Sequence, residues 1–199
     1  MKKKRLVLFD FDGTITSRDT LAAMMIYYHG TFRYRAGLAI LAPVLALYVR
    51  KLIPNWRAKQ IMMSWFFRGE DISKFNQKCI DFSRTVIPKL VRPKAIDMIR
   101  HYRSTGATVA VVSASAENWV KPWCDEHQLV CLATRLETKN NVITGRFKGK
   151  NCHGPEKVCR ITEEFNLHDF DEIIAYGDTA GDREMLALAH QKHYRPFRN

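Results

Sequence analysis

Two aspartates, one residue apart, follow a short apolar run near the start of the chain. Residues 6–9 predict a buried strand, and Asp10 and Asp12 come directly after it, followed by Gly13. Because side chains in a strand alternate in direction, we expect the two carboxylates to point to the same side. Adjacent carboxylates repel each other unless a cation or a shared proton relieves them. Mg²⁺ prefers hard oxygen ligands, so this pair predicts a magnesium site.

A second acidic group follows another predicted strand, at residues 172–176. There the sequence continues Gly177-Asp178-Thr179-Ala180-Gly181-Asp182. Asp178, at the end of the strand, could complete the metal site. Asp182 comes where a helix begins, so it is either a helix N-cap or a further member of the acidic centre.

Two other side chains could offset this negative charge toward an anionic substrate. Ser113 follows a strand predicted at residues 107–112, where its hydroxyl could serve either a phosphate oxygen or the next helix as a cap. Lys157 falls in the first turn of a predicted helix. A lysine there is unfavourable to the helix dipole, which favours a functional role. The four aspartates, the serine and the lysine together predict a phosphate-handling site.

Strand and helix patterns alternate over most of the chain. Strands are predicted at residues 6–9, 107–112, 172–176 and 193–197, and helices at 95–105, 116–127, 155–166 and 182–189. This order is typical of an α/β fold with a parallel sheet, whose ligands bind beyond the carboxyl ends of the strands. Residues 136–147 predict a hairpin.

Residues 20–88 predict several helices and almost no strand. We therefore expect a helical cap inserted after the first strand, with residues 90–93 as the return connection. The predicted domains are a core of residues 1–16 and 89–199 and a cap of residues 17–88.

The composition limits the partners and the compartment. Lys and Arg number 32 against 20 Asp and Glu, a formal charge of +12, which favours phosphorylated metabolites, nucleic acid or acidic lipid headgroups. No nucleic-acid-binding motif is apparent, so nucleic acid is the least favoured of the three. Five cysteines without a CxxC pair predict reduced thiols in a cytoplasmic protein, and the first apolar run is too short for an export signal.

One segment of the predicted cap, residues 36–49, contains no charge, while arginines and a lysine flank it on both sides. As a helix rising about 1.5 Å per residue it would span about 21 Å, less than a hydrocarbon core of about 30 Å. Pro43 would kink it. Two interpretations remain open besides a spanning helix: a buried cap helix, or an apolar element on an anionic membrane surface.

The ordered set of motifs resembles a known family. Asp10-Phe11-Asp12-Gly13-Thr14, then Ser113, then Lys157, then Gly177-Asp178 with Asp182 resemble the four motifs of the haloacid dehalogenase (HAD) superfamily of phosphatases. The resemblance covers nearly the whole chain. A helical insert directly after the first motif is similar to subfamily IB, the phosphoserine-phosphatase-like branch. It implies a Rossmann-like core with a parallel sheet and a helical cap.

The resemblance also implies roles for individual residues. Asp10 would be the nucleophile that forms an aspartyl-phosphate. Asp12 would protonate the leaving oxygen and then activate the hydrolytic water. Ser113 and Lys157 would bind the phosphoryl oxygens.

The implied cofactor is Mg²⁺. Its ligands would be the Asp10 carboxylate, the Asp12 backbone carbonyl and Asp178, and Asp182 would support Lys157 and metal-bound water.

The sequence differs from phosphoserine phosphatases at several positions. Asp19 stands in place of a glutamate, Gly181 in place of an asparagine, and Ala114 and Ser115 in place of glycines. The apolar segment 36–49 and residues 151–157 are similar to a bacterial branch that includes a phosphatidylglycerophosphate phosphatase.

Three functions are therefore considered. The first is a Mg²⁺-dependent phosphomonoester hydrolase for a small metabolite such as phosphoserine. The second is a lipid-headgroup phosphatase in peripheral contact with the anionic inner face of a membrane. The third, from another class, is a non-catalytic anion- or nucleic-acid-binding protein on the same fold.

Overall fold

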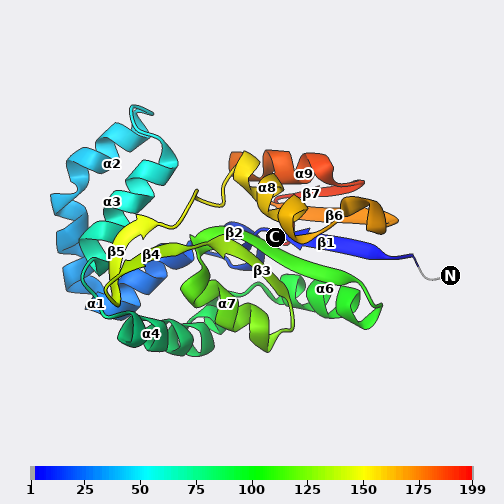
Figure 1. Ribbon diagram of the computed structural model, residues 1–199, viewed down its shortest axis with the longest axis horizontal. Helices are drawn as coiled ribbons and strands as arrows, with labels where there is room; N and C mark the ends of the chain where they lie inside the picture. Colours follow the sequence, from blue (N-terminus) through cyan, green and yellow to red (C-terminus); the bar gives the residue numbers. More distant parts are fainter. Residues whose placement is uncertain (1–2, 199) are drawn as a thin grey trace.

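The computed structural model describes residues 3–198, so Met1, Lys2 and Asn199 of the predicted core lie outside the described residues. A parallel sheet of five strands, ordered β3-β2-β1-β6-β7, forms the centre of the molecule (Figure 1). The predicted α/β fold with a parallel sheet is confirmed. The strands are β1 (Arg5–Phe9), β2 (Thr108–Ala116), β3 (Val130–Thr134), β6 (Glu172–Gly177) and β7 (Gln191–Tyr194).

Helices cover both faces of this sheet (Figure 1). Helices α6 (Pro93–Ser104) and α7 (Glu117–Glu126) lie on one face, and α8 (Pro155–Glu164) and α9 (Arg183–Leu188) lie on the other. Central strand β1 shows why both faces must be covered. Val7 and Phe9 belong to one apolar cluster and Leu6 and Leu8 to the other, so alternate side chains are buried on opposite faces.

The structure differs from the sequence prediction at three strands. Edge strand β3 was not predicted. Strand β2 continues past Ser113 to Ala116, with a shift in its pairing to β3 between these two residues. The predicted strand 193–197 was misplaced: β7 ends at Tyr194, because Arg195 and Phe197 have positive φ angles that turn the chain. The four predicted core helices are present, with ends moved by no more than two residues.

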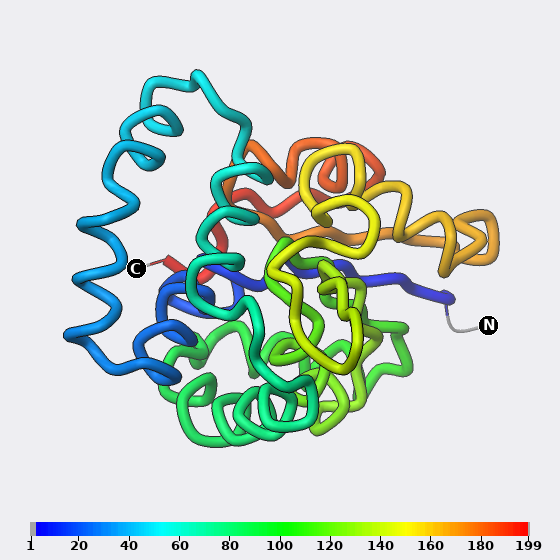
Figure 2. Tube along the Cα trace, turned by 60° about the vertical axis from the view of Figure 1, so that its left-hand side comes forward, coloured from blue at the N-terminus to red at the C-terminus, as the bar shows by residue number. Residues whose placement is uncertain are grey.

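The connection between β1 and α6 is helical, as predicted. It contains α1 (Thr20–Ile40), α2 (Ala42–Val49), α3 (Asn55–Phe67), α4 (Ile72–Thr85) and α5 (Ile87–Leu90). Its two ends run side by side, since Ser17 N–H donates to Leu90 O (2.8 Å) and Arg92 N–H donates to Ile15 O (2.8 Å). From there α1 and α2 lead away from the sheet, and α3 runs back toward the rest of the molecule (Figure 2). The division into a core and a cap stays a prediction.

The predicted hairpin, β4 (Leu136–Lys139) and β5 (Val142–Phe147), is present and pairs with the connection between α3 and α4. Gly69 N–H donates to Ile143 O (2.8 Å) and Ile143 N–H to Glu70 O (2.9 Å). At Gly145, where φ is +81°, a Cβ atom would lie 2.3 Å from the Cα of Ser64 in α3. The absence of a side chain at this residue lets the hairpin contact the helix backbone.

The uncharged segment 36–49 is not a continuous helix. Helices α1 and α2 meet at an angle of 64°, and Pro43 lies in the first turn of α2, so the predicted kink is confirmed. Every residue of α2 is at least partly exposed, which contradicts the interpretation as a buried cap helix. Among residues 3–198 no single helix has the length and apolar composition to cross a membrane, although α1 and α2 together meet those two criteria.

We predict that Gly145→Ala destabilises the protein much more than Gly69→Ala. Both glycines have positive φ angles, but a Cβ at Gly69 meets no atom within 4 Å. Each substitution should cost about 1–2 kcal/mol of backbone strain. Gly145→Ala should lose about 1–3 kcal/mol more through overpacking against α3. Denaturant unfolding of both variants measures the difference, and equal losses would contradict the contact.

Candidate active site

A buried lysine holds the centre of the site together. The Nζ of Lys157 donates to Asp10 Oδ1 (2.6 Å), to Asp182 Oδ1 (2.6 Å) and to the carbonyl oxygen of Val112 (2.7 Å). Lys157 is 1% exposed. Burial alone would lower the pKa of Lys157, but the carboxylates of Asp10 and Asp182 outweigh it and raise that pKa above its usual value. The ammonium therefore stays charged.

Sheet topology explains why these residues meet. Strands β2, β1 and β6 are parallel neighbours, so the residues at their carboxyl ends share one edge of the sheet. Asp10 follows β1, Asp178 follows β6, and Pro155 begins α8 so that Lys157 falls in its first turn. The structure thus brings together four predicted site residues: Asp10, Lys157, Asp178 and Asp182.

Asp182 has two roles at once. Its Oδ2 accepts hydrogen bonds from the backbone N–H groups of Asp178 (3.0 Å) and Thr179 (2.9 Å) and from the Thr179 hydroxyl (3.0 Å), which forms a capping box. Its Oδ1 binds Lys157. The Asp182 side chain makes no cap hydrogen bond to α9, so the N-cap alternative is wrong; Asp182 is the third residue of a capping box begun by Thr179 and a member of the acidic centre.

Asp10 and Asp178 are the carboxylates best placed to hold a cation. Oxygen atoms of Asp10, Asp178 and Asp182 lie within 4.8 Å of one another. Asp178 Oδ1 is buried and has no hydrogen-bond partner among the described residues, whereas both oxygens of Asp182 are bonded. Burial raises the pKa of Asp10 to about 7 despite Lys157 and also raises the pKa of Asp178. A divalent cation would relieve this destabilised negative charge.

Gly13 keeps the first motif close to these carboxylates. Its φ is +83°, and a Cβ atom at this position would lie 2.4 Å from Asp178 Oδ2. A residue with a side chain would therefore displace Asp178.

The side chain of Asp12 is positioned by a turn and not by strand alternation, so the reason given for its orientation was wrong. Strand β1 ends at Phe9, and Phe11–Ile15 form a short helical turn. The Asp12 carboxylate accepts hydrogen bonds from Thr20 N–H (2.7 Å) and from the Ser115 hydroxyl. Burial, with a contribution from Asp19, raises the pKa of Asp12.

Ser115 and Thr20 were not recognised from the sequence as site residues. Their hydroxyl oxygens lie 3.2 Å apart, and Trp119 Nε1 donates to Thr20 Oγ1 (3.1 Å). Ser115 could have been identified from the sequence, because it stands where the resembling phosphoserine phosphatases have a glycine. Ser113 is fully buried, and its Oγ accepts a hydrogen bond from Ser115 N–H (3.0 Å). Its role in phosphate binding stays a prediction.

A cavity of about 700 Å³, here called the acidic cavity, opens in front of this group. Its walls include side chains that no motif identified, because they come from the cap, the loop before α8 and the C-terminus. These are Arg18, Tyr48, Asn55, Lys59, His153 and Arg198. Arg18, Lys59 and Arg198 add positive charge around the acidic centre. The Nη2 of Arg198 lies 2.5 Å from Asp178 Oδ2.

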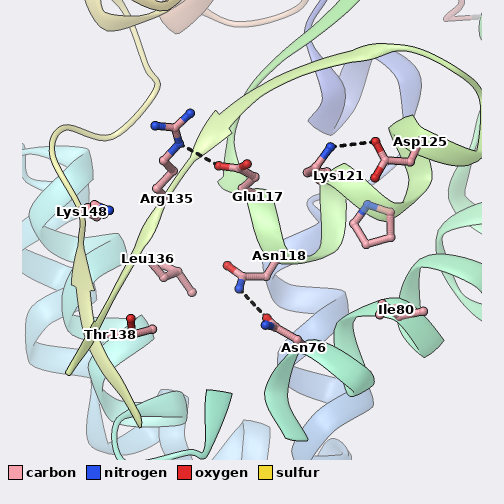
Figure 3. Close-up of a pocket in the computed structure, with 11 residues that line it drawn as sticks. Asn76, Ile80, Glu117, Asn118, Lys121, Asp125, Arg135, Leu136, Thr138 and Lys148 are labelled. Carbon is pink, nitrogen blue, oxygen red and sulfur yellow. Dashed lines mark hydrogen bonds and ion pairs between the residues drawn. The ribbon is translucent and has the colours of Figure 1, made fainter. Parts of the chain in front are cut away.

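A different hollow, of about 600 Å³, lies between α4, α7 and the hairpin (Figure 3). Its polar side chains bond to one another: Asn118 donates to Asn76 (2.7 Å) and Arg135 pairs with Glu117 (3.0 Å). None of the residues of the acidic centre line it. We therefore do not assign the active site to this hollow.

The model of the haloacid dehalogenase-like hydrolase family matches residues 7–187. The chain belongs to this family. Protein CicA of Caulobacter vibrioides is 35% identical over 195 residues, which cover 97% of this chain and 86% of CicA. This agrees with the resemblance drawn from the four motifs.

Solved structures share the fold. A protein of unknown function from Bordetella pertussis Tohama I superimposes with a TM-score of 0.81 at 23% identity, covering 94% of this chain and 87% of that one. A substrate-bound phosphoserine phosphatase superimposes with a TM-score of 0.65, also at 23% identity, covering 98% and 87%. The fold of the chain is therefore that of a HAD protein with a Rossmann-like core.

We predict that MgCl₂ raises the melting temperature of the wild-type protein but not of Asp178→Asn. Binding to the folded state alone stabilises it by about 2.7 kcal/mol when the free ion is at 100 times its dissociation constant. The control is Asp125→Asn, which removes an exposed carboxylate paired with Lys121, away from the acidic centre. Equal shifts in wild type and Asp178→Asn would contradict the assignment of Asp178 as a ligand.

Proposed function

We propose that the chain is a phosphomonoester hydrolase that acts through an aspartyl-phosphate on Asp10. The observation that carries this proposal is the setting of the Asp10 carboxylate. It is 7% exposed, it borders the acidic cavity, and the Lys157 ammonium and the Thr14 hydroxyl (3.1 Å) each hold one of its oxygens. A carboxylate oriented in this way is suited to attack phosphorus.

The reaction would proceed in two displacements. In the first, an Asp10 oxygen forms a bond to phosphorus, the bond from phosphorus to the alcohol oxygen breaks, and Asp12 donates its proton to that oxygen. In the second, water attacks phosphorus, Asp12 takes a proton from the water, and the Asp10–phosphorus bond breaks to release inorganic phosphate. The raised pKa of Asp12 supports its first role, because it favours the protonated form.

Ser115 and Thr20 N–H would hold the Asp12 side chain in place for both proton transfers. Lys157 would orient Asp10 and offset negative charge during the displacement. Asp10 and Asp178 would hold Mg²⁺ together with the Asp12 carbonyl. When bound, the ion supplies charge neutralisation at the phosphoryl oxygens.

A small metabolite such as phosphoserine is the first candidate substrate. A cavity of about 700 Å³ is large enough for such a molecule, and Arg18 and Lys59 line it with positive charge that favours an anion. Catalytic use of the site is also the simplest reason for the crowded carboxylates. A non-catalytic anion-binding protein would gain nothing from three buried carboxylates grouped together, two of them bonded to one lysine.

We predict that Asp10→Asn loses at least about a thousandfold in phosphate release, because the amide is a far weaker nucleophile than a carboxylate. Circular dichroism should report an intact fold, since an asparagine side chain retains nearly the same shape. The control is Asp171→Asn, which changes an exposed carboxylate bonded to Lys4 N–H. Turnover like that of the wild type in Asp10→Asn would remove Asp10 as the nucleophile.

A lipid headgroup phosphate, such as that of phosphatidylglycerophosphate, is the second candidate substrate. The observation that favours it is the set of large apolar side chains on α1, α2 and the loop after α2. Phe32, Ile40, Val49 and Leu52 are 85, 58, 76 and 67% exposed. Arg33, Arg35, Arg50 and Lys51 lie among them in the sequence. Apolar side chains beside cations are suited to an anionic bilayer surface, where each cation contributes about 1 kcal/mol.

We predict that the protein sediments with phosphatidylglycerol-containing liposomes and that Val49→Glu/Leu52→Glu does not. The substitutions place two carboxylates where apolar side chains would enter the lipid interface. The control, Trp65→Glu/Tyr194→Glu, adds the same charge at two other exposed apolar residues, 50 and 55% exposed. Equal sedimentation of both double variants would leave the lipid alternative without its supporting observation.

A further inference from the structure

A second cavity adjoins the acidic cavity. It has a volume of about 730 Å³ and lies between the start of α3 and the segment that runs from β5 into α8; it is here called the side cavity. The two cavities share Asn55 and His153 in their walls. A molecule whose phosphate occupies the acidic cavity could therefore extend past these two residues into the side cavity.

The side cavity has apolar walls from both cap and core. Pro54 and Trp56 come from the start of α3, and Phe147 and Pro155 from the two ends of the segment that leads into α8. Trp56 is 49% exposed, so an indole face remains open to a ligand. Such walls would bind an aromatic or alkyl group through loss of apolar surface to water.

Two buried amide atoms add a polar requirement. Asn151 is 7% exposed; its Oδ1 accepts a hydrogen bond from Thr134 (3.0 Å), but its Nδ2 has no partner within residues 3–198. Asn55 Oδ1 is also buried without a partner, while its Nδ2 donates to Tyr48 (3.0 Å). Buried polar atoms without a partner are costly, and both residues line the side cavity. A ligand hydroxyl or ester oxygen could accept from Asn151 Nδ2, whereas Asn55 Oδ1 needs a ligand hydroxyl that donates.

The boundary between the cavities depends on a glycine. A Cβ atom at Gly181 would lie 2.3 Å from His153 Nε2, so the imidazole occupies space that a side chain at residue 181 would take. The Gly154 N–H donates to Gly181 O (2.9 Å) and fixes the loop that carries His153. Gly181 therefore sets how the acidic cavity opens toward the side cavity.

We propose that the side cavity is the subsite for the alcohol part of the phosphate ester, and that it selects amphipathic alcohols with an apolar body over serine. The phosphate would lie in the acidic cavity and the alcohol would pass Asn55 and His153. This proposal rests on the phosphatase function proposed above and deepens it, because among the candidate substrates it disfavours phosphoserine. Two classes of phosphate ester contain such an alcohol: a soluble alkyl or aryl phosphate, and a lipid.

The first experiment measures kcat/KM for methyl, propyl and hexyl phosphate. We expect a rise of about fourfold for each methylene that becomes buried. In Trp56→Ala the ratio of kcat/KM for hexyl to that for methyl phosphate should fall at least tenfold. Trp65→Ala is the matched control, because Trp65 is also on α3 and is 50% exposed but does not line the side cavity. No dependence on chain length, or equal ratios in the two variants, would overturn the subsite.

A second experiment does not need turnover. Cys159 is exposed and lines the side cavity, so hexylphosphonate should slow its alkylation by iodoacetamide more than methylphosphonate does. The assay uses Asp10→Asn, with Cys159 identified by peptide mapping. Protection without phosphate release from any ester would refute the phosphatase and support the subsite. Phosphate release without protection of Cys159, and without dependence of kcat/KM on chain length, would support the phosphatase and refute the subsite.

Micellar phosphatidylglycerophosphate distinguishes the two sources. If the subsite serves a lipid, the wild type should hydrolyse this lipid faster than hexyl phosphate, and Trp56→Ala should reduce that advantage. If it serves a soluble ester, hexyl phosphate should be preferred and the same substitution should reduce that preference. A preference that Trp56→Ala leaves unchanged would count against the subsite for either source.

Discussion

The site depends on the buried ion pairs of Lys157. The Lys157 ammonium, from the first turn of α8, bonds to Asp10 after β1 and to Asp182 after β6. It also bonds to the carbonyl oxygen of Val112 in β2. Removing the ammonium would leave the buried carboxylates of Asp10 and Asp182 without their cation, which costs about 3–5 kcal/mol. Loss of one carboxylate leaves Lys157 paired with the other. Lys157 therefore contributes both to the stability of the core and to the orientation of Asp10.

The cap is tied to this centre through Asp12. The two connections between cap and core are hydrogen-bonded to each other beside the first motif, at Ser17 and Leu90. Directly after them, Thr20 begins α1 and its N–H binds the Asp12 carboxylate. A shift of α1 would therefore move a hydrogen-bond donor of the residue proposed to transfer protons.

Sequence reasoning predicted the residues whose positions follow from sheet topology. Asp10, Asp178 and Lys157 come directly after strands or at a helix start, and parallel strands bring such residues to one edge without further information. Sequence reasoning failed for residues whose positions depend on tertiary packing. Edge strand β3 is not followed by acidic residues like those after β1 and β6, and the turn at Phe11–Ile15 replaced the strand expected to orient Asp12. Asn55 and Trp56 begin α3, and no motif in that helix indicated that they would face residues 147–159.

Three of the four departures from the resembling phosphoserine phosphatases have a physical counterpart in the structure. Ser115 donates a hydrogen bond to Asp12, Gly181 leaves the space that His153 occupies, and Asp19 caps α1 by accepting from Leu21 N–H (2.8 Å). Two of these three changes alter the supports or the walls of the acidic cavity, since Ser115 bonds to Asp12 and Gly181 borders the cavity. In the proposed reaction they would bear on the proton transfer by Asp12 and on the space for the leaving alcohol. Asp10, Lys157 and Asp178, which would hold and attack the phosphoryl group, match the motifs of the resembling enzymes.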